Sequence, residues 1–352
     1  MDMGSQNPLK VLVVGGAGYI GSHVVYDLIR AGHDVAVADN LSTGMRAAVH
    51  PNARFYQADI TRLEEITNVF SQEAKQGKKD GFEAPSSPID VVMHFAAKLD
   101  VAESVDRPLQ YYHNNVEGVR VLLDAMLLAQ VKNIVFSSTA AVYGDPSVQE
   151  PIKEDAELTP INPYGASKLA AEQLIQWTAS ANDINYAILR YFNASGADDS
   201  LKIGLEKPKY THLIPLAVRA ALGLEDSLKI FGDDWPTHDG SCVRDYIHVS
   251  DLSYAHLLAA DYLVQKQDSL LVNLGTEHGS SVKEIIAAVE RLRLCPYQVV
   301  GRRQGDPAIL IADAQKARHL LGWKAERTVN DIVESDMRYR LAADERSVLA
   351  WE

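Results

Sequence analysis

The chain has 352 residues, of which 47% are hydrophobic and 23% are charged, and its formal net charge is -13. This composition is typical of a soluble globular enzyme or binding protein with one large or two moderate domains. The negative charge argues against nucleic acid or an anionic membrane as a general partner, so an anionic ligand has to be met by local arginines and helix ends.

The cysteines and the N-terminal residues bear on the cellular compartment. Cys242 and Cys295 lie far apart without metal-ligand spacing, which predicts buried thiols, a reducing compartment and no metal site. Residues 1–8 are polar, and we expect them to be disordered. Because no apolar run approaches membrane-spanning length, we expect a cytoplasmic protein without a membrane partner.

The first predicted element is a strand that runs into a glycine-rich turn. The apolar residues 10–14 precede Gly15, Gly18 and Gly21, after which apolar residues recur at helical spacing. Glycines allow the backbone to turn sharply and to approach a ligand, and a helix start favours a pyrophosphate. A plain strand-to-helix turn has the same pattern, so the context has to decide between the two interpretations.

The next two predicted strands end near acidic residues. Residues 34–39 end in Asp39, where a carboxylate can bind the ribose of an adenosine. Its charge would repel a 2′-phosphate and so favours NAD over NADP, although Arg46 follows closely. A third strand over residues 53–60 carries Asp59, which could face the adenine.

Further strands bring small and hydroxyl residues to the same edge of the sheet. A fourth strand is predicted over residues 89–98, after an exposed loop over residues 73–88 to which we assign no function. Its small residues Ala96 and Ala97 leave room for a cofactor. A fifth strand starting at residue 133 ends in Ser137-Ser138-Thr139, at the carboxyl end where open α/β sheets bind ligands.

A helix that follows residue 162 places Tyr164 and Lys168 one turn apart on the same face. A lysine ammonium beside a phenol favours the phenolate and so lowers the pKa of the tyrosine, which suits a base acting on a hydroxyl group. Taken alone, the two residues are more often part of an ordinary amphipathic helix. Here the glycine turn, Asp39 and the hydroxyl residues occur in the expected order. We therefore favour a catalytic pair over an ordinary amphipathic helix.

The pattern predicts an α/β protein with a Rossmann-type doubly wound parallel sheet and a smaller C-terminal substrate-binding region. We expect the NAD-binding domain to span residues 9–193, with residues 243–264 returning to it. Residues 194–242, where prolines interrupt the alternation, and residues 265–345 would form the smaller domain.

A series of longer motifs resembles the extended short-chain dehydrogenase/reductase family and, within it, the UDP-glucose (UDP-galactose) 4-epimerase group. The resemblance runs from about residue 9 to residue 321. Its most specific segments are GGAGYIGSH at residues 15–23, SSTAAVYG at 137–144, NPYGASK at 162–168, LRYFNASGA at 189–197, VRDYIHV at 243–249 and RRQGD at 302–306.

The resemblance implies a role for individual residues. It makes Tyr164 the base, Lys168 its tuning partner and nicotinamide-ribose ligand, and Thr139 the hydroxyl that bridges to the sugar. The residues it implies around tightly bound NAD are Gly15, Gly18, Tyr19, Ile20, Gly21, Asp39, Asn40, Asp59, Ile60, Phe95, Ala96, Ala97, Lys98, Asn115, Ser137, Ser138, Tyr164, Lys168 and Tyr191. The residues it implies around the UDP-sugar are Lys98, Thr139, Tyr164, Phe192, Asn193, His212, Leu213, Lys229, Phe231, Arg244, Tyr246, Arg303, Asp306 and Ile309.

The implied reaction is an NAD-dependent 4-epimerisation of UDP-hexoses through a transient 4-keto sugar. Tyr164 removes the proton of the 4-hydroxyl group while the hydride passes to bound NAD and later returns to the opposite face. Arg244 and Arg303 hold the diphosphate as a pivot. His212 stands where some relatives carry asparagine, and either side chain can donate a hydrogen bond.

Three alternatives follow from the same residues. A 4,6-dehydratase would need acidic residues after the threonine to protonate the leaving hydroxyl, but Ala140 and Ala141 stand there. Epimerases of UDP-uronates or UDP-pentoses stay open. A non-catalytic NAD-binding regulator is compatible with the fold, although Thr139, Tyr164 and Lys168 argue against it.

Two finer expectations also rest on the resemblance. Ile309 occupies a position where relatives carry either a bulky tyrosine or a smaller residue, so we expect UDP-GlcNAc and UDP-GalNAc to be accepted beside UDP-Glc and UDP-Gal. Relatives are commonly homodimers through helices around residues 108–128 and 164–180, which predicts a homodimer here.

Overall fold

The computed structural model describes residues 8–76, 89–146, 150–207, 210–303 and 307–349. Within these ranges the chain forms two compact units. Unit 1 comprises residues up to Gly144, Leu158–Arg190 and Ser253–Val272, and unit 2 comprises Asp145–Glu157, Tyr191–Leu252 and the residues from Asn273 onward. All but one of the eight N-terminal residues expected to be disordered lie outside the described ranges.

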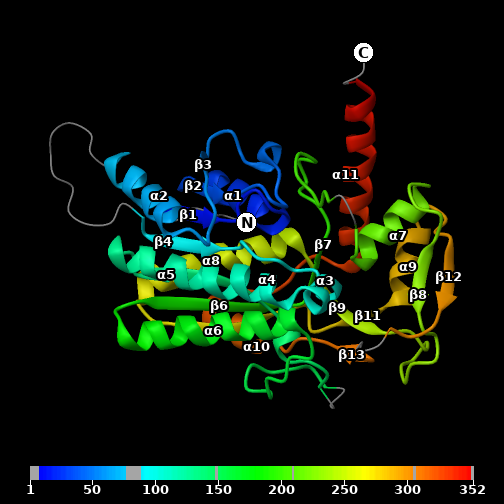
Figure 1. Ribbon diagram of the computed structural model, residues 1–352. Coiled ribbons are helices and arrows are strands. Elements are labelled where there is room, and N and C mark those ends of the chain that lie inside the picture. The colour runs from blue at the N-terminus through cyan, green and yellow to red at the C-terminus, as the bar shows by residue number, and fades with distance from the viewer. Residues whose placement is uncertain (1–7, 77–88, 147–149, 208–209, 304–306, 350–352) are drawn as a thin grey trace. The chain divides into compact units, whose positions relative to one another are not determined.

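Unit 1 is built on a seven-stranded sheet with the strand order β10-β6-β5-β4-β1-β2-β3 (Figure 1). The four pairs that join β3 to β5 are parallel. The order reverses direction at β1, as in a doubly wound fold, and the Rossmann-type prediction is confirmed. The strands are β1 (Lys10–Val14), β2 (Asp34–Asp39), β3 (Arg54–Gln57), β4 (Val91–His94), β5 (Asn133–Thr139), β6 (Asn185–Tyr191) and β10 (Leu270–Leu274).

Helices cover both faces of this sheet. On one face, α5 packs between α2 and α6, and α3 and α4 also contact α6. On the other face, α1 and α8 are joined by a hydrogen bond of 2.6 Å from Ser253 Oγ to Asp27 Oδ2. The helices are α1 (Tyr19–Arg30), α2 (Leu63–Gln76), α3 (Val101–Asp106), α4 (Pro108–Tyr112), the π-helical segment η2 (His113–Glu117), α5 (Gly118–Leu128), α6 (Pro163–Ala181) and α8 (Val249–Lys266), with short 3₁₀ turns at Arg46–Ala48 and Ala140–Val142.

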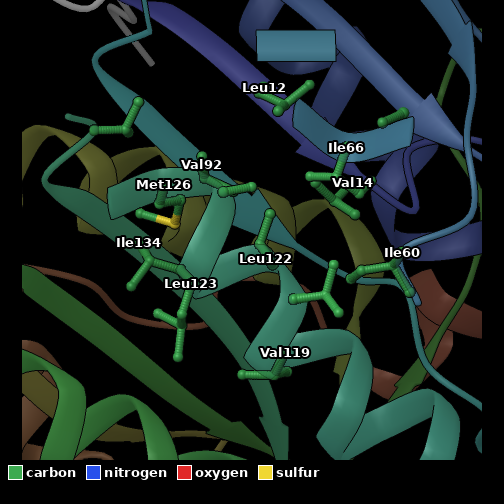
Figure 2. Close-up of a cluster of buried hydrophobic side chains, with 14 of the residues drawn as sticks. Leu12, Val14, Ile60, Ile66, Val92, Val119, Leu122, Leu123, Met126 and Ile134 are labelled. Carbon is green, nitrogen blue, oxygen red and sulfur yellow. The ribbon is translucent and has the colours of Figure 1, made fainter. Parts of the chain in front are cut away.

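The core of unit 1 lies between the sheet and the layer of α2 and α5. Figure 2 shows side chains of α5, among them Leu122 and Met126, near strand residues such as Val92 and Ile134. These side chains are almost completely buried. Strands covered on both faces need continuous apolar runs, which explains why the sequence of β1 does not alternate. The core fixes the strands whose carboxyl ends carry the candidate site.

Unit 2 has its own sheets and its own core. Strand β9 (Val243–His248) pairs with β7 (Asn193–Ser195), β11 (Gly279–Ser281) and β13 (Ile309–Leu310), and β8 (Leu228–Phe231) pairs with β12 (Tyr297–Val300). The core cluster draws mainly on β8 and on the apolar faces of three helices. The helices of this unit are α7 (Leu213–Ala221), α9 (Val282–Glu290), α10 (Gln315–Leu321) and α11 (Val329–Leu349).

The unit boundaries differ from the sequence-based ones at four places. Residues 191–193, expected in the NAD-binding domain, belong to unit 2, and residues 265–272, expected in the smaller domain, belong to unit 1. Residues 243–252 belong to unit 2 rather than to the first domain, because β9 is the central strand of the unit 2 sheet. Residues 145–157 also belong to unit 2, where Ile152 forms a β-bridge with Ala312. Residues 253–272 belong to unit 1. The hydrophobic pattern predicts strand β9. It does not predict which strands pair with β9, because pairing depends on tertiary structure.

Candidate active site

The glycine turn after β1 forms a tight cradle. Gly15 has a φ of +84°, and a Cβ atom there would lie 2.4 Å from the backbone nitrogen of Ala96. Gly18 is the N-cap of α1, and no side chain caps the helix there. A side chain at Gly15 would therefore collide with the loop after β4. Backbone N–H groups at this helix start can bind an anion such as a pyrophosphate.

An acidic residue at the end of β2 is tied to the cradle. The carboxylate of Asp39 accepts hydrogen bonds from the backbone N–H groups of Ala17 (3.0 Å) and Leu41 (2.8 Å). Burial raises the pKa of Asp39, and these two hydrogen bonds oppose the rise. Each carboxylate oxygen accepts one of these bonds and has a further lone pair, so the group can still receive a ribose hydroxyl.

The next predicted cofactor residues lie around the end of β3. Asn40 donates from Nδ2 to Asp59 Oδ2 at 3.1 Å, so two residues predicted to contact the cofactor also contact each other. Strand β3 ends at Gln57, earlier than the sequence suggested, and Asp59 lies in the following loop. The side chain of Ile60 is buried in the core (Figure 2), so only its backbone is available to a ligand.

The loop after β4 is fixed by one asparagine. Asn115 accepts a hydrogen bond from Lys98 N (2.8 Å) and donates to Lys98 O and to Ser167 Oγ (both 3.0 Å). It lies in the π-helical segment η2, and such local widening of a helix is frequent at functional sites. The loop that carries Phe95, Ala96 and Ala97 is thereby held at the cradle and connected to α6.

Three consecutive residues at the end of β5 each contact a residue of α6. Lys168 Nζ donates to the carbonyl oxygen of Ser137 at 2.7 Å. The hydroxyl of Ser138 donates to the carboxylate of Glu172. The side chain of Thr139 lies next to that of Tyr164 and acts to lower the pKa of the phenol. Helix α6 starts where Asn162 accepts from the backbone N–H of Gly165 (2.9 Å), which places Tyr164 in the first turn.

The protonation of the tyrosine differs from the sequence-based expectation. Burial raises the pKa of Tyr164, and Thr139 opposes the rise only in part. Burial also lowers the pKa of Lys168 to about 8, while the charge of Glu172 acts in the opposite direction. We expected the lysine to lower the pKa of the phenol, but in this structure burial raises it, and the group that opposes the rise is Thr139.

In unit 2, several predicted substrate residues meet on neighbouring strands. Asn193 of β7 donates to the carbonyl oxygen of Asp245 at 3.0 Å and lies in register with Tyr246 of β9. On β13, Ile309 pairs with Val243 of β9. Arg244, which lies between these positions on β9, is half-buried and donates to its neighbour's carbonyl at 2.9 Å. The predicted pivot, Arg244, and the predicted size gate, Ile309, thus lie on two paired strands.

The remaining predicted substrate residues of unit 2 lie on other elements. The guanidinium of Arg303 stacks on the ring of Phe231 with 4.1 Å between the Cζ atom and the ring centroid. Lys229 is exposed on the same strand, β8. His212 is the N-cap residue of α7 and Leu213 its first residue, while Tyr191 and Phe192 follow the buried part of β6. Asp306 lies outside the described residues.

Four buried polar residues near α6 and β5 escaped the sequence analysis. Glu172 and Arg190 form an ion pair with 2.6 Å between Oε2 and Nη2. His256 of α8 hydrogen-bonds Ser137 Oγ at 2.9 Å. His94 is 1% exposed, and neither of its ring nitrogens meets a hydrogen-bond partner in the described part of the chain. Of these residues, only Glu172 could have been identified from the sequence, because it lies one helical turn after Lys168.

The described ranges lack two kinds of feature. No group of three or more histidine, cysteine, aspartate or glutamate side chains there could hold a metal ion. No helix in the same ranges has both the length and the apolar character needed to cross a membrane. Both cysteines are buried free thiols.

Comparison with known proteins matches residues 11–275 to the model of the NAD dependent epimerase/dehydratase family. The chain belongs to this family. A UDP-glucose 4-epimerase of Lactobacillus helveticus is 45% identical over 334 residues, which are 94% of this chain and 97% of that protein. The family match includes the glycine cradle, the end of β5 and the first turns of α6.

Two solved structures are similar to this chain over almost its whole length. A UDP-glucose 4-epimerase from Brucella ovis in complex with NAD has a TM-score of 0.87 and 42% identity, covering 94% of this chain and 98% of that one. A UDP-Glc/GlcNAc 4-epimerase from Campylobacter jejuni has a TM-score of 0.80 and 38% identity, covering 95% and 99%.

Proposed function

We propose that the protein is a UDP-glucose 4-epimerase that uses tightly bound NAD and acts at C4 of the sugar. The observation that carries the proposal is the junction of β5 and α6, where Lys168 Nζ donates a hydrogen bond to Ser137 O and the side chain of Thr139 lies next to that of Tyr164. Relatives of more than 40% identity that bear this activity in their names support it.

The residues of unit 1 fit NAD. The turn at Gly15 and Gly21 has no space for a side chain, as expected where a backbone must approach a pyrophosphate. Asp39 is placed to accept from a ribose hydroxyl, and Phe95, Ala96 and Ala97 form the loop beside Gly15. When bound, NAD supplies an acceptor and then a donor for the hydride at sugar C4, and its positive ring favours a phenolate nearby.

The protein's own groups move and hold the proton. Tyr164 takes the proton of the sugar O4 and later returns it, and Thr139 orients the phenol and bridges to O4. Lys168 has three N–H donors, of which one is used by Ser137 O, so the others can hold a ribose. Because the hydride and the proton both return, the reaction has no net redox change.

The unit 2 residues bind the nucleotide. Arg244 and Arg303 supply positive charge for the diphosphate, and Phe231 offers a ring for the base. Asn193, Tyr246, His212 and Leu213 line the same proposed region. Binding energy from the nucleotide holds the substrate while leaving the sugar free to present either face.

The proposed substrate range includes N-acetylated sugars. Ile309 is smaller than a tyrosine and leaves room for an acetamido group beside Val243. The Campylobacter jejuni relative is named for both UDP-Glc and UDP-GlcNAc, which supports the same range here.

We also propose that the protein is a cytoplasmic homodimer. Large apolar side chains are exposed on α3 to α6, and α6 contacts each of the other three helices. The most exposed are Leu109 (83%), Trp177 (75%), Leu128 (71%) and Val105 (62%). An apolar surface of this kind is typical of a protein interface.

The decisive experiment is to incubate the purified protein, without added NAD, with UDP-Gal and separately with UDP-GalNAc, and to identify the products by NMR. UDP-Glc from the first reaction would establish a 4-epimerase that carries its cofactor, and UDP-GlcNAc from the second would establish the wider range. If neither product forms even after NAD is added, the assignment is rejected, and UDP-uronates and UDP-pentoses are tested next.

A further inference from the structure

Behind the Tyr164–Lys168 pair lies a buried polar network in which Glu172, Arg190 and Tyr143 have no role in the function proposed above. Glu172 and Arg190 are 1% and 2% exposed, and Ser138 and Tyr143 are equally enclosed. The guanidinium of Arg190 donates hydrogen bonds to both carboxylate oxygens of Glu172, with Nε–Oε1 at 3.1 Å and Nη2–Oε2 at 2.6 Å. Its Nη1 donates to Tyr143 Oη at 3.1 Å.

The network is connected to the proposed catalytic pair at two points. Tyr164, Lys168 and Glu172 follow one another at intervals of one helical turn, so they share one face of α6. On β5, Ser138 donates to Glu172. It stands between Ser137, which accepts from Lys168, and Thr139, which lies next to Tyr164. Glu172 therefore holds the strand that carries both partners of the pair.

We propose that Glu172 is a positioning residue for the Tyr164–Lys168 pair: anchored by Arg190, its carboxylate locks α6 to the end of β5 and supplies the negative charge that keeps the buried Lys168 cationic. This inference rests on the proposed function only for its effect on turnover.

The other groups around Lys168 do not supply that charge. They are the phenol of Tyr164 on α6, His94 on β4, Arg190 on β6, and His256 on α8, which reaches the site through Ser137. Burial, together with the charge of Lys168, lowers the pKa of His94 to about 3, so His94 stays neutral. Burial lowers the pKa of Lys168 to about 8, and Glu172 is the group whose charge opposes this.

The chain contains a matched control at the opposite, amino edge of the same sheet. Glu73 is 0% exposed, and its carboxylate accepts from Arg54 at 2.8 and 2.9 Å and from Tyr56 Oη at 2.6 Å. Glu73→Gln therefore removes a buried carboxylate that is bound by an arginine and a tyrosine of the same unit, without touching α6 or β5. It should destabilise the protein as Glu172→Gln does.

The first test reads the charge of Lys168 without turnover. Protein labelled with ¹³C at lysine Cε is titrated by NMR, and Lys168→Arg identifies the signal. We expect Glu172→Gln to lower the pKa of Lys168 by on the order of one unit. Glu172→Asp, which keeps the charge, and Glu73→Gln should leave it near the wild-type value. An unchanged Lys168 titration in Glu172→Gln overturns the proposal.

The second test measures how kcat declines at alkaline pH, where Lys168 loses its proton. This decline is called the alkaline limb. In Glu172→Gln this limb should move to lower pH by the same amount, and Glu172→Asp should restore it. If Glu172→Gln does not fold, the double variant Glu172→Gln/Arg190→Met removes both charges without leaving one unpaired, and it should shift the limb in the same direction. If the midpoint of the alkaline limb does not change while the NMR titration shows a lower pKa for Lys168, the role of Glu172 in turnover is overturned. A wild-type protein without turnover rejects the proposed function instead, and the NMR titration still decides the inference.

Discussion

The side chain of Thr139, the last residue of β5, lies next to that of Tyr164, in the first turn of α6. This contact joins the carboxyl end of the sheet, where ligands of doubly wound folds bind, to the residue proposed as the base. It also counteracts part of the rise in the pKa of Tyr164 that burial causes.

Replacing Tyr164 by Phe tests the proposed base directly. The variant keeps the ring and loses the hydroxyl, so kcat should fall roughly 10²- to 10⁴-fold, the usual contribution of general acid–base catalysis. The content of bound NAD, measured after denaturation of the purified protein, should stay at the wild-type level. Turnover within a few-fold of wild type would reject the role of Tyr164.

The pH dependence of turnover should report Lys168. Because burial lowers its pKa to about 8, the ammonium group is complete well below this pH and is lost as the pH rises through it. We therefore expect kcat to decline above about pH 8. Arginine does not deprotonate in this range, so Lys168→Arg should be slower but should lack the alkaline decline. A decline of equal midpoint in both proteins would assign it to another group.

The cradle can be tested with two glycines of similar backbone conformation. Gly15 and Gly32 have φ values of +84° and +86°, so alanine costs each about 1 kcal/mol of conformational strain. A Cβ at Gly15 also collides with Ala96, whereas at Gly32 it meets nothing within 4 Å. Gly15→Ala should therefore lose bound NAD and Gly32→Ala should keep it, as measured by cofactor content alongside thermal unfolding. Equal NAD retention in both variants would contradict the cradle.

The sequence predicted most of the fold because hydrophobic periodicity and glycine turns are local signals. The apolar residues of β1 and β2 and the glycine turn that follows β1 can be recognised from the sequence alone. The placement of β9 in unit 2 was not predicted, since its partners β7, β11 and β13 come from distant segments. Strand pairing of this kind depends on tertiary contacts.

The site was predicted where a residue type and its spacing carry the chemistry, as for Tyr164 and Lys168. The sequence did not predict the properties of the site that depend on burial and on distant contacts. The direction of the Tyr164 pKa depends on desolvation, which a sequence does not show. His256 reaches Ser137 from a helix far along the chain, and no pattern in the sequence indicates that contact.

Ile309→Tyr tests the proposed substrate range. The phenol should fill the space for an acetamido group, so kcat/KM for UDP-GalNAc should fall by about 10- to 100-fold, while UDP-Gal is affected little. Ile309→Leu keeps the volume and should leave the ratio of the two substrates unchanged. The two rates are compared by NMR under identical conditions. Parallel losses on both substrates in the tyrosine variant would show that residue 309 is not a size gate.

The proposed dimer predicts which exposed apolar side chains matter. Leu109 and Trp177 lie on α4 and α6, which contact each other, whereas Leu294 of unit 2 is as exposed as Trp177, at 76%. Because a charge buried in an interface without a partner is costly, Leu109→Asp and Trp177→Asp should each weaken association by roughly 2 kcal/mol or more, which is at least about 30-fold in Kd. Leu294→Asp should leave the mass in solution unchanged. Analytical ultracentrifugation over a range of concentrations separates the cases. Dimers of undiminished affinity in both helix variants, or dissociation caused by Leu294→Asp, would place the interface elsewhere.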